Sequence, residues 1–248
     1  MPKILFISDL HLSPKAPEIL QQFSCFLEQT APQAQAVYIL GDLFDAWIGD
    51  DDPSPFAAHV RDMLQQASRH TSLFFQHGNR DFLVGEAFSR AANFSLLPEE
   101  YVMEIAGKPV LLLHGDQLCT DDQDYQQARK LFRSPEFYAQ IMALSIPERI
   151  RKAAEIRQMS SEATAAKPSD IMDVNQHAVE NIMKKHGVQR LLHGHTHRPA
   201  CHQFSLDGKP VERIVLSDWR AAGSAALQID DKTGMAEAIP CLARSGLT

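Results

Sequence analysis

The chain has few cysteines, no long apolar run and no excess of basic residues. Its four cysteines lie far apart without paired spacing, which argues against a disulfide framework and against a thiolate zinc site. No stretch approaches the roughly 18 consecutive apolar residues that a membrane-spanning helix needs. The first residues run into a short strand pattern rather than a signal segment. We therefore expect a cytoplasmic protein with ordinary thiols.

A basic surface is also missing from the chain as a whole. The net charge of −7 argues against a general nucleic-acid binder, because affinity for a phosphate backbone needs a positive field. The charge is uneven: residues 126–200 contain twelve Lys or Arg against seven Asp or Glu, a local +5 that leaves −12 for the remainder. Two interpretations of this positive region stay open, a solvated helix surface and a site for an anionic partner.

The length and composition indicate one domain with an insertion. A chain of 248 residues with 44% hydrophobic content can bury a full core. After His114, about fifty residues carry no strand signal but place apolar side chains among basic ones. We expect a core formed by residues 1–120 and 168–248 and an inserted helical lid over residues 121–167, with a loop or frayed turn at 160–166.

Five short apolar runs predict buried strands. They are residues 3–7, 37–40, 73–75, 110–113 and 191–192. Their apolar residues are nearly continuous, which is typical of strands covered on both faces. Polar segments follow each run: Asp9-Leu-His11, Gly41-Asp42, Gly78-Asn79-Arg80-Asp81, His114-Gly115-Asp116 and Gly194-His195-Thr196-His197. Since ligands bind at the carboxyl ends of strands in α/β sheets, we expect these segments to meet in one site.

Further elements follow from periodicity. Helical spacing predicts helices at about 18–30, 56–69, 85–92 and 170–186, and Gly187 predicts the end of the last one. Residues 214–216 and 225–229 predict two more strands, which we expect to complete a second sheet.

The polar segments carry the side chains that divalent cations prefer. Carboxylate, amide and imidazole ligands without thiolate suit a pair of borderline-hard ions. Two such ions can clamp a phosphoryl group and lower the pKa of bound water. Taken singly, each Asp is more often a helix cap and each His more often structural, but the joint pattern favours ligation.

These segments resemble the calcineurin-like metallophosphoesterase superfamily over about 190 residues. The resemblance implies an α/β fold, a four-layer αββα sandwich. It also implies that Asp9, His11, Asp42 and His197 hold one metal, whereas Asp42, Asn79, His114 and His195 hold the other, with Asp42 as the bridge. The catalytic set would be Asp42, Asn79, Arg80 and His195.

One position departs from the common superfamily pattern. Much of the superfamily has His where this chain has Arg80. Arg80 cannot act as a general acid, because a guanidinium remains protonated near neutral pH. It is better suited to orienting a phosphate and stabilising developing charge. The alternative is a surface arginine paired with Asp81.

Longer segments resemble one branch, the UDP-2,3-diacylglucosamine pyrophosphatases of lipid A biosynthesis. They are residues 41–51, 78–83, 118–122 and 171–175. The resemblance implies two Mn²⁺ ions, attack of water on the phosphorus next to uridine, and release of UMP and 2,3-diacylglucosamine 1-phosphate. It further implies sugar-phosphate contacts from Asn79, Arg80, Asp122, Ser160, Thr164, Lys167 and His195. Thr164 departs from the Asn common in the branch.

The lid fits a diacylated substrate, because acyl chains need apolar walls and a phosphate needs cations. Phe82, Leu83 and Tyr125 are candidates for the acyl chamber, with core packing as the alternative. Arg149, Arg151 and Lys152, close to Ile146 and Ile150, could rest on the anionic cytoplasmic face of the inner membrane, so we expect peripheral association.

Two rival functions remain at this level. A general phosphodiesterase or nuclease would use the same metal site but needs a positive, aromatic-bearing open groove. The overall acidity disfavours that rival and a nucleic-acid partner. A non-catalytic scaffold would be expected to lack some ligand residues, whereas all seven are present here.

Overall fold

The first sheet contains the three strands that precede Asp9, Asp42 and Asn79. A computed structural model describes residues 3–166 and 173–241 of the chain. In this sheet the strand order is β11-β10-β1-β2-β3-β4. The parallel strands are β1 (Lys3–Ile7), β2 (Ala36–Leu40), β3 (Ser72–Gln76) and the short β4 (Ser95–Leu96). On the other side of β1, β10 (Ser224–Asp230) and β11 (Ala236–Cys241) continue the sheet antiparallel.

The second sheet has the order β5-β6-β7-β9-β8. Its parallel centre is formed by β6 (Lys108–Leu112), β7 (Arg190–His193) and β9 (Lys209–Val215). The antiparallel edges are β5 (Tyr101–Ile105) and β8 (Ala200–Leu206). The prediction that both C-terminal strands join this sheet is wrong for β10, which hydrogen-bonds to β1 instead. Strand periodicity cannot show which sheet a strand joins.

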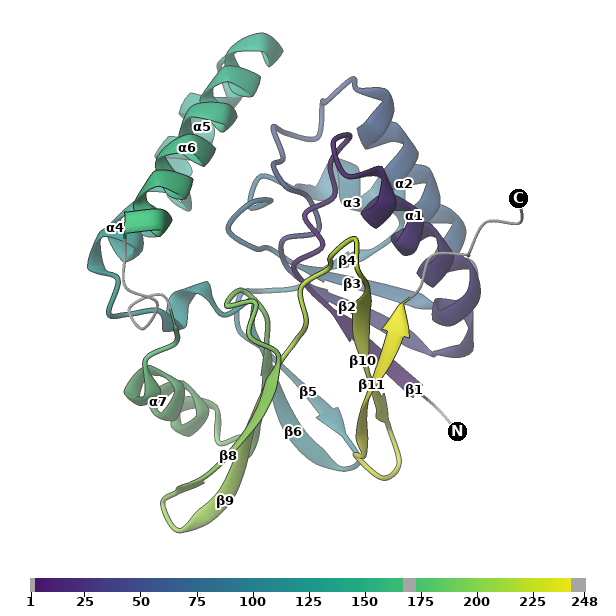
Figure 1. Cartoon of the computed structure of the whole chain (residues 1–248), viewed down its shortest axis with the longest axis vertical. Helices are drawn as coiled ribbons and strands as arrows, with labels where there is room; N and C mark the ends of the chain where they lie inside the picture. The colour runs from purple at the N-terminus through teal and green to yellow at the C-terminus, as the bar shows by residue number, and fades with distance from the viewer. Residues whose placement is uncertain (1–2, 167–172, 242–248) are drawn as a thin grey trace.

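Alternating side chains on the central strands build two separate cores. Ile4 and Phe6 of β1 pack between the two sheets, against Leu112, Leu192 and their neighbours. Leu5 and Ile7 point the other way, into the core under the helices. A third cluster covers the outer face of the second sheet. The layers are therefore helix, sheet, sheet and helix, which confirms the predicted α/β fold with four layers (Figure 1).

Three helices cover the first sheet. They are α1 (Pro17–Cys25), which continues as the π-helix η1 (Phe26–Thr30) and the 3₁₀ turn η2 (Ala31–Gln33), α2 (Pro55–Ala67) and α3 (Glu86–Ala92). Helix α2 begins at Ser54, whose hydroxyl accepts a hydrogen bond from the Ala57 backbone N–H, followed by Pro55 at the first helical position. The three N-terminal helices predicted from periodicity are confirmed.

Helix α7 (Gln176–His186) covers the second sheet through Val179 and Met183. It ends at Gly187 with φ of 65°, as predicted. Its start differs from the prediction, because Asn175 accepts a hydrogen bond from the Ala178 N–H and caps the helix there. Residues 173–175 are not helical, and the predicted residues 170–172 lie outside the described part of the chain.

A helical segment stands beside the two sheets. It follows the turn η3 (Asp116–Leu118) and consists of α4 (Gln123–Phe132), α5 (Pro135–Met142) and α6 (Ile146–Ala166), with α6 extending away from the sheets in Figure 1. The predicted loop or frayed turn at 160–166 is wrong, because α6 continues through it. The stretch Ser-Ser-Glu-Ala-Thr-Ala-Ala contains three Ala and one Glu but no Gly or Pro, so it can sustain a helix.

The edge strands were not predicted, because their exposed residues give no apolar run. Asp207-Gly208 nevertheless joins β8 to β9 with positive φ at both residues, and Asp-Gly is a strong hairpin signal. Among the described residues, no helix combines the length and apolarity that crossing a membrane requires.

Candidate metal centre and adjoining clefts

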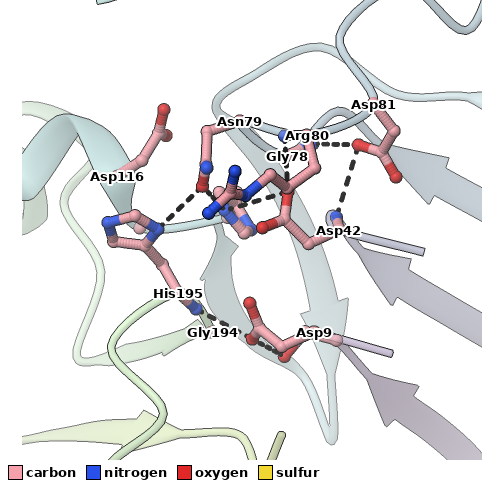
Figure 2. A network of polar contacts seen from close by, with 12 residues as sticks. Asp9, Asp42, Gly78, Asn79, Arg80, Asp81, Asp116, Gly194 and His195 are labelled. Carbon is pink, nitrogen blue, oxygen red and sulfur yellow. Dashed lines mark hydrogen bonds and ion pairs between the residues drawn. The ribbon is translucent and has the colours of Figure 1, made fainter. Parts of the chain in front are cut away.

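Loops from both sheets bring the seven predicted ligands to one place, and Figure 2 labels four of them, Asp9, Asp42, Asn79 and His195. Asp9 and His11 follow β1, Asp42 follows β2 and Asn79 follows β3. From the second sheet, His114 follows β6, whereas His195 and His197 follow β7. All these loops leave the carboxyl ends of parallel strands, which is why residues 188 positions apart can meet. The segments converge as predicted, with loops contributed by both sheets.

Asp9, His11 and His197 form one group that could hold a cation. Nε2 of His11 lies 3.1 Å from Nε2 of His197, and Nε2 of His197 lies 3.4 Å from Oδ1 of Asp9. That Oδ1 is buried without a hydrogen-bond partner, whereas Oδ2 accepts hydrogen bonds from Ser8 Oγ and the His195 backbone N–H. A buried carboxylate oxygen without a donor is stabilised by a bound cation.

Asp9, Asp42 and His114 form the second group. Nδ1 of His114 lies 2.8 Å from the Leu40 carbonyl oxygen, so it carries the proton and donates it there. In the neutral ring Nε2 is then a lone-pair acceptor. It faces Oδ1 of Asn79 at 3.0 Å and Oδ1 of Asp42 at 3.7 Å. Converging acceptors of this kind need a cation between them.

Asn79 connects this group to His195. Its side-chain oxygen lies 2.9 Å from Nδ1 of His195, besides its contact with His114. Asp42 lies between the two groups, since its Oδ2 is 3.9 Å from Nδ1 of His11 while its Oδ1 faces His114. This geometry suits a bridging role for Asp42.

The pKa shifts of the predicted ligands indicate that the centre lacks positive charge. Burial and the nearby charge of Asp9 raise the pKa of Asp42, against the opposing effect of His114. Burial disfavours charge on His114, but the Asp42 and Asp9 carboxylates outweigh it and raise its pKa. Burial lowers the pKa of His11 to about 4 and that of His195 to about 3, which keeps both rings neutral. Neutral imidazoles and ionised carboxylates are the forms that bind divalent ions, so His11 and His195 are in the binding form, whereas Asp42 and His114 would release bound protons as an ion binds.

The backbone at the centre is strained. Positive φ angles occur at Asp9 (56°), His11 (49°), Asp42 (52°), His195 (69°) and His197 (54°), a region that non-glycine residues rarely adopt. Each such residue costs on the order of 1–3 kcal/mol and persists only where its surroundings enforce it. Strain at five of the seven predicted ligands is typical of functional loops.

Two glycines permit the close approach of these loops. A Cβ atom added to Gly78 would lie 2.0 Å from Oδ1 of Asp42, and one added to Gly194 would lie 2.3 Å from Oδ2 of Asp9. Any side chain at either position would displace a predicted ligand. The Gly residues of the Gly-Asn and Gly-His motifs are therefore steric requirements of the centre.

Asp81 organises two of the loops, a role that sequence reasoning missed. Its carboxylate accepts hydrogen bonds from the backbone N–H groups of Asp42, Leu43, Phe44 and Gly78, at 2.7–3.3 Å. The alternative in which Asp81 pairs with a surface Arg80 is wrong, because the fully buried carboxylate is directed at these amides (Figure 2). The sequence feature that could have identified Asp81 is its position in the same segment as Asn79 and Arg80.

Asp218 was missed as well. Its Oδ2 lies 3.7 Å from Nδ1 of His197 and accepts a hydrogen bond from Nε of Arg220 at 2.7 Å. It follows the carboxyl end of β9, the same kind of position that identified the other loops.

The comparisons with known proteins agree with this geometry. The family model described as calcineurin-like phosphoesterase matches residues 2–199. The chain belongs to the calcineurin-like phosphoesterase family. Membership of this metallophosphoesterase family, together with the acceptor-rich centre, implies divalent metal ions.

Curated relatives are similar over most of their length. The UDP-2,3-diacylglucosamine hydrolase of Chromohalobacter salexigens is 47% identical over 92% of this chain and 93% of its own. That of Serratia proteamaculans is 48% identical over 89% of this chain and 92% of its own. Among solved structures, a dimetal phosphatase from Danio rerio is similar in fold, with a TM-score of 0.51 at 12% identity, covering 98% of this chain and 99% of that one.

Two clefts separate the phosphoesterase centre from the helical segment. The larger one, of about 300 Å³, is lined by Asn79 and Arg80 from the centre and by Tyr125, Phe132 and Met159 from α4 and α6, among others. The smaller one, of about 60 Å³, lies between the loop after β2 and helices α5 and α6. Arg80 and Phe82 line both clefts. Arg80 thus lies where the metal centre opens onto apolar walls.

The predicted substrate contacts are distributed unevenly over these clefts. Asp122, Ser160 and Tyr125 line the larger cleft, and Leu83 lines the smaller one. Asp122 also caps α4, since its Oδ1 accepts a hydrogen bond from the Tyr125 N–H. Thr164 is described only by its backbone, on α6, and Lys167 lies outside the described residues.

Tyr125 has a second environment besides the cleft. Its ring lies 5.9 Å from that of His195, and its hydroxyl donates to Oδ2 of Asp116 at 3.0 Å. Asp116 is fully buried and also accepts from Nε of Arg129 at 2.7 Å. Sequence reasoning quoted Asp116 in the His-Gly-Asp segment but gave it no role.

Arg149 differs from the prediction of a membrane-facing residue. It is only 6% exposed, and its guanidinium donates to the Leu144, Ile48 and Met142 carbonyls and to Oδ1 of Asp51. Arg157, further along α6, pairs with Asp45. These contacts hold α6 against the loop that follows β2, so Arg149 is unable to face a lipid surface.

Proposed function

We propose that this chain hydrolyses the pyrophosphate of UDP-2,3-diacylglucosamine, giving UMP and 2,3-diacylglucosamine 1-phosphate. The observation that carries the proposal is the position of Arg80, at the junction of an acceptor-rich centre and an apolar-walled cleft of about 300 Å³. A substrate that joins a pyrophosphate to acyl chains needs both environments within one molecule's reach. The relatives named UDP-2,3-diacylglucosamine hydrolase support the same substrate.

The cofactors we propose are two Mn²⁺ ions. Asp9, His11, Asp42 and His197 would hold one, whereas Asp42, Asn79, His114 and His195 would hold the other. The orphaned Oδ1 of Asp9 and the lone pair of His114 fit such ions. When bound, the ions supply Lewis acidity that activates water and offsets phosphate charge. Because oxygen and imidazole ligands accept several ions, the preference for manganese rests on the resemblance.

The side chains at the centre would orient the substrate phosphates and stabilise their charge. Arg80 would hold the sugar phosphate that leaves, because its planar fork binds phosphate oxygens and stabilises charge as the bond to the uridine phosphate breaks. Asn79 and His195 would contact the same phosphate from the centre. The burial that keeps His195 neutral makes it a ligand and hydrogen-bond partner rather than a general acid.

The segment 121–167 would act as a lid over the acyl chains. Phe82, Phe132 and Phe137 contact one another at ring-centroid distances of 5.0–6.3 Å and form an apolar junction between the clefts. Leu83 and the Tyr125 ring would extend this wall. Asp122, Ser160, Thr164 and Lys167 would bind the sugar head group.

Peripheral association with the inner membrane belongs to the same proposal, since the substrate is a lipid. Leu131, Tyr138, Ile150 and Met159 on α4, α5 and α6 are 48–69% exposed, and Arg151 and Lys152 lie next to Ile150. Exposed apolar side chains beside cations suit an anionic lipid surface.

The test is UMP release from UDP-2,3-diacylglucosamine with and without Mn²⁺, for the wild type, Asp42→Ala and Arg80→Ala. Bis-nitrophenyl phosphate serves as a general phosphodiester control. We expect metal-dependent UMP release, lost in Asp42→Ala, with little action on the control. Strong action on the control without UMP release would reject the substrate and favour a general phosphodiesterase.

A further inference from the structure

Helix α4 meets the core through two arginines and two carboxylates. Nε of Arg129 donates to Asp116 Oδ2 at 2.7 Å, and its NH2 group donates to Glu99 at 3.0 Å. Arg133 pairs with Glu99 at 2.5 Å and lies 3.6 Å from Asp116. Asp116 follows β6 and Glu99 precedes β5, so the cluster joins the helix to two core loops. The two positive and two negative charges balance.

Arg133 also reaches the loop that carries Asn79 and Arg80. Its NH2 group donates to the Gly78 carbonyl oxygen at 3.0 Å. On the other side of that residue, the Gly78 N–H donates to Asp81 at 2.8 Å. Gly78 is therefore held from both sides, by a side chain of the core and by a side chain of α4.

A shift of Gly78 would move residues that we propose to bind the metal ions and the phosphate. The carbonyl that Arg133 holds belongs to the peptide joining Gly78 to Asn79, whose side chain contacts His114 and His195. The next N–H, that of Arg80, donates to Asp42 Oδ1 at 2.8 Å. Asp42 leaves no space at the Gly78 Cα, since an added Cβ would lie 2.0 Å from it. A small shift of this peptide would thus displace Asn79, Arg80 and Asp42 together.

We propose that Arg133 is a positioning residue, which from helix α4 holds the Gly78–Asn79 peptide and keeps Asn79 and Arg80 in their reactive placement. The inference rests on the proposed function. Arg133 lines the larger cleft, but its guanidinium is 14% exposed and is occupied by the protein acceptors Glu99, Gly78 and Asp116, so these contacts tie it to the loop. The helix that walls the cleft thereby also sets the geometry of the centre.

A simpler role would be to anchor α4, and the two roles differ in their kinetics. A loosened α4 would weaken the cleft wall formed by Tyr125, Ala128 and Phe132, which raises KM most for long acyl chains. A displaced Asn79–Arg80 loop would lower kcat equally for every acyl length, because the reacting phosphates are the same.

The experiment measures kcat and KM of Arg133→Met, Arg133→Lys and the exposed helix control Arg90→Met, on substrates with long and with short acyl chains. We expect kcat of Arg133→Met to fall about 10- to 100-fold on both substrates, since misplacement by about 1 Å can cost 100-fold. Arg133→Lys should recover part of this loss, because it restores a charged donor to Gly78. Among the described residues Arg90 pairs with Glu86 on its own helix α3, so its variant should match the wild type.

Unchanged kcat in Arg133→Met, or a KM effect confined to long acyl chains, would overturn the inference while wild-type UMP release still supports the proposed function. A wild type that releases no UMP would overturn both. If Arg133→Met does not fold in a thermal unfolding test, Glu99→Gln replaces it, because it loosens Arg133 from outside the cleft. A kcat for Glu99→Gln equal to that of the wild type would then count against the positioning role.

Discussion

The loops of the metal centre and the helical segment α4–α6 are built by different physical means. In the loops, Asp9, Asp42 and His114 are at most 2% exposed, and several neighbours hold positive φ angles. In the helical segment, no residue of α4 is buried. On α6 of the same segment, the large apolar side chain of Met159 is 69% exposed.

We infer from this contrast that the loops hold the reacting groups, whereas the helices select the substrate. Buried, strained loops with no spare volume hold ligands in one arrangement, so they tolerate little change. The helices pack on the core through Phe137 and Ile141 as well as through ion pairs, and their exposed side chains can differ without disturbing those ligands. We therefore expect substitutions in the loops to change turnover and those in the helices, apart from Arg133 at the end of α4, to change stability or binding.

The largest expected effect is that of Asp42→Ala, at the centre of the loops. Loss of the carboxylate that we propose to bridge the two ions should lower turnover about 10³-fold or more, because metal ions supply several kcal/mol of charge stabilisation. UMP release and the Mn²⁺ content of the purified protein measure it. Asp62→Ala, an exposed carboxylate on α2, is the control. Retained metal and turnover would contradict the ligand assignment.

Asp116→Asn tests where the helical segment meets the loops. The buried pairs with Arg133 and Arg129, together with His114, hold the pKa of Asp116 well below its usual range despite the opposing effect of burial. A lowered carboxyl pKa stabilises the fold above the unfolded pKa of about 4, and this contribution is lost as pH falls below it. We expect a loss of about 3 kcal/mol at pH 6.

Urea unfolding of wild type and Asp116→Asn between pH 6 and pH 3 measures this difference. The gap between the two proteins should stay constant down to about pH 5 and then narrow as the unfolded wild type takes up a proton at Asp116, which the folded protein keeps ionised. A gap that widens in acid would show that Asp116 is protonated in the folded protein.

Gly78→Ala tests how closely the loops of the metal centre are packed against each other. The added methyl group would press on Asp42 Oδ1, and the resulting shift should lower kcat about 100-fold, which corresponds to about 2.7 kcal/mol. Gly107→Ala is the control, because its φ of 72° adds backbone strain that Gly78 lacks, whereas nothing lies within 4 Å of the added atom. Equal kcat in both variants would mean that the loop can yield.

Arg149→Met should cost stability rather than chemistry. Removing a buried guanidinium leaves the Ile48, Met142 and Leu144 carbonyls without their donor, and we expect a loss of about 2 kcal/mol. The Asp51 pair adds little, since that carboxylate is 53% exposed. Thermal unfolding measures it against Arg151→Met, an exposed position on the same helix. A similar Tm in the two variants would refute the anchoring role.

The smallest effect concerns the exposed side of the helices. Lys152→Ala should weaken flotation with anionic vesicles by about 1 kcal/mol, or about fivefold, and leave neutral vesicles unaffected. Neutralising Lys152 and Arg151 together without any loss of anionic vesicle binding would exclude this face as the membrane contact.

Much of the fold was predictable because local patterns carry it. Apolar runs marked the central strands, and Gly187 marked a helix end through local backbone chemistry. The edge strand β8 was missed because its exposed residues lack an apolar run. Strand β10 was recognised but assigned to the wrong sheet, since pairing with β1 depends on contacts more than 200 residues apart.

The candidate site was predictable for a similar reason. Each of its segments follows a strand and carries its own metal-binding side chains, so Asp9, Asn79 and His114 could be identified one motif at a time. Asp81, Asp116 and Arg133 were not identifiable in this way. Their roles depend on which amide, hydroxyl or carbonyl lies opposite them in space.

The charge distribution shows the same division. Composition alone determined that residues 126–200 are positive within an acidic chain. Only the tertiary structure decided that Arg129, Arg133, Arg149 and Arg157 of this region pair with Asp116, Glu99, Asp51 and Asp45 of the core. The sequence determines the number and order of charges, but ion pairing falls off steeply with distance, and folding alone sets those distances.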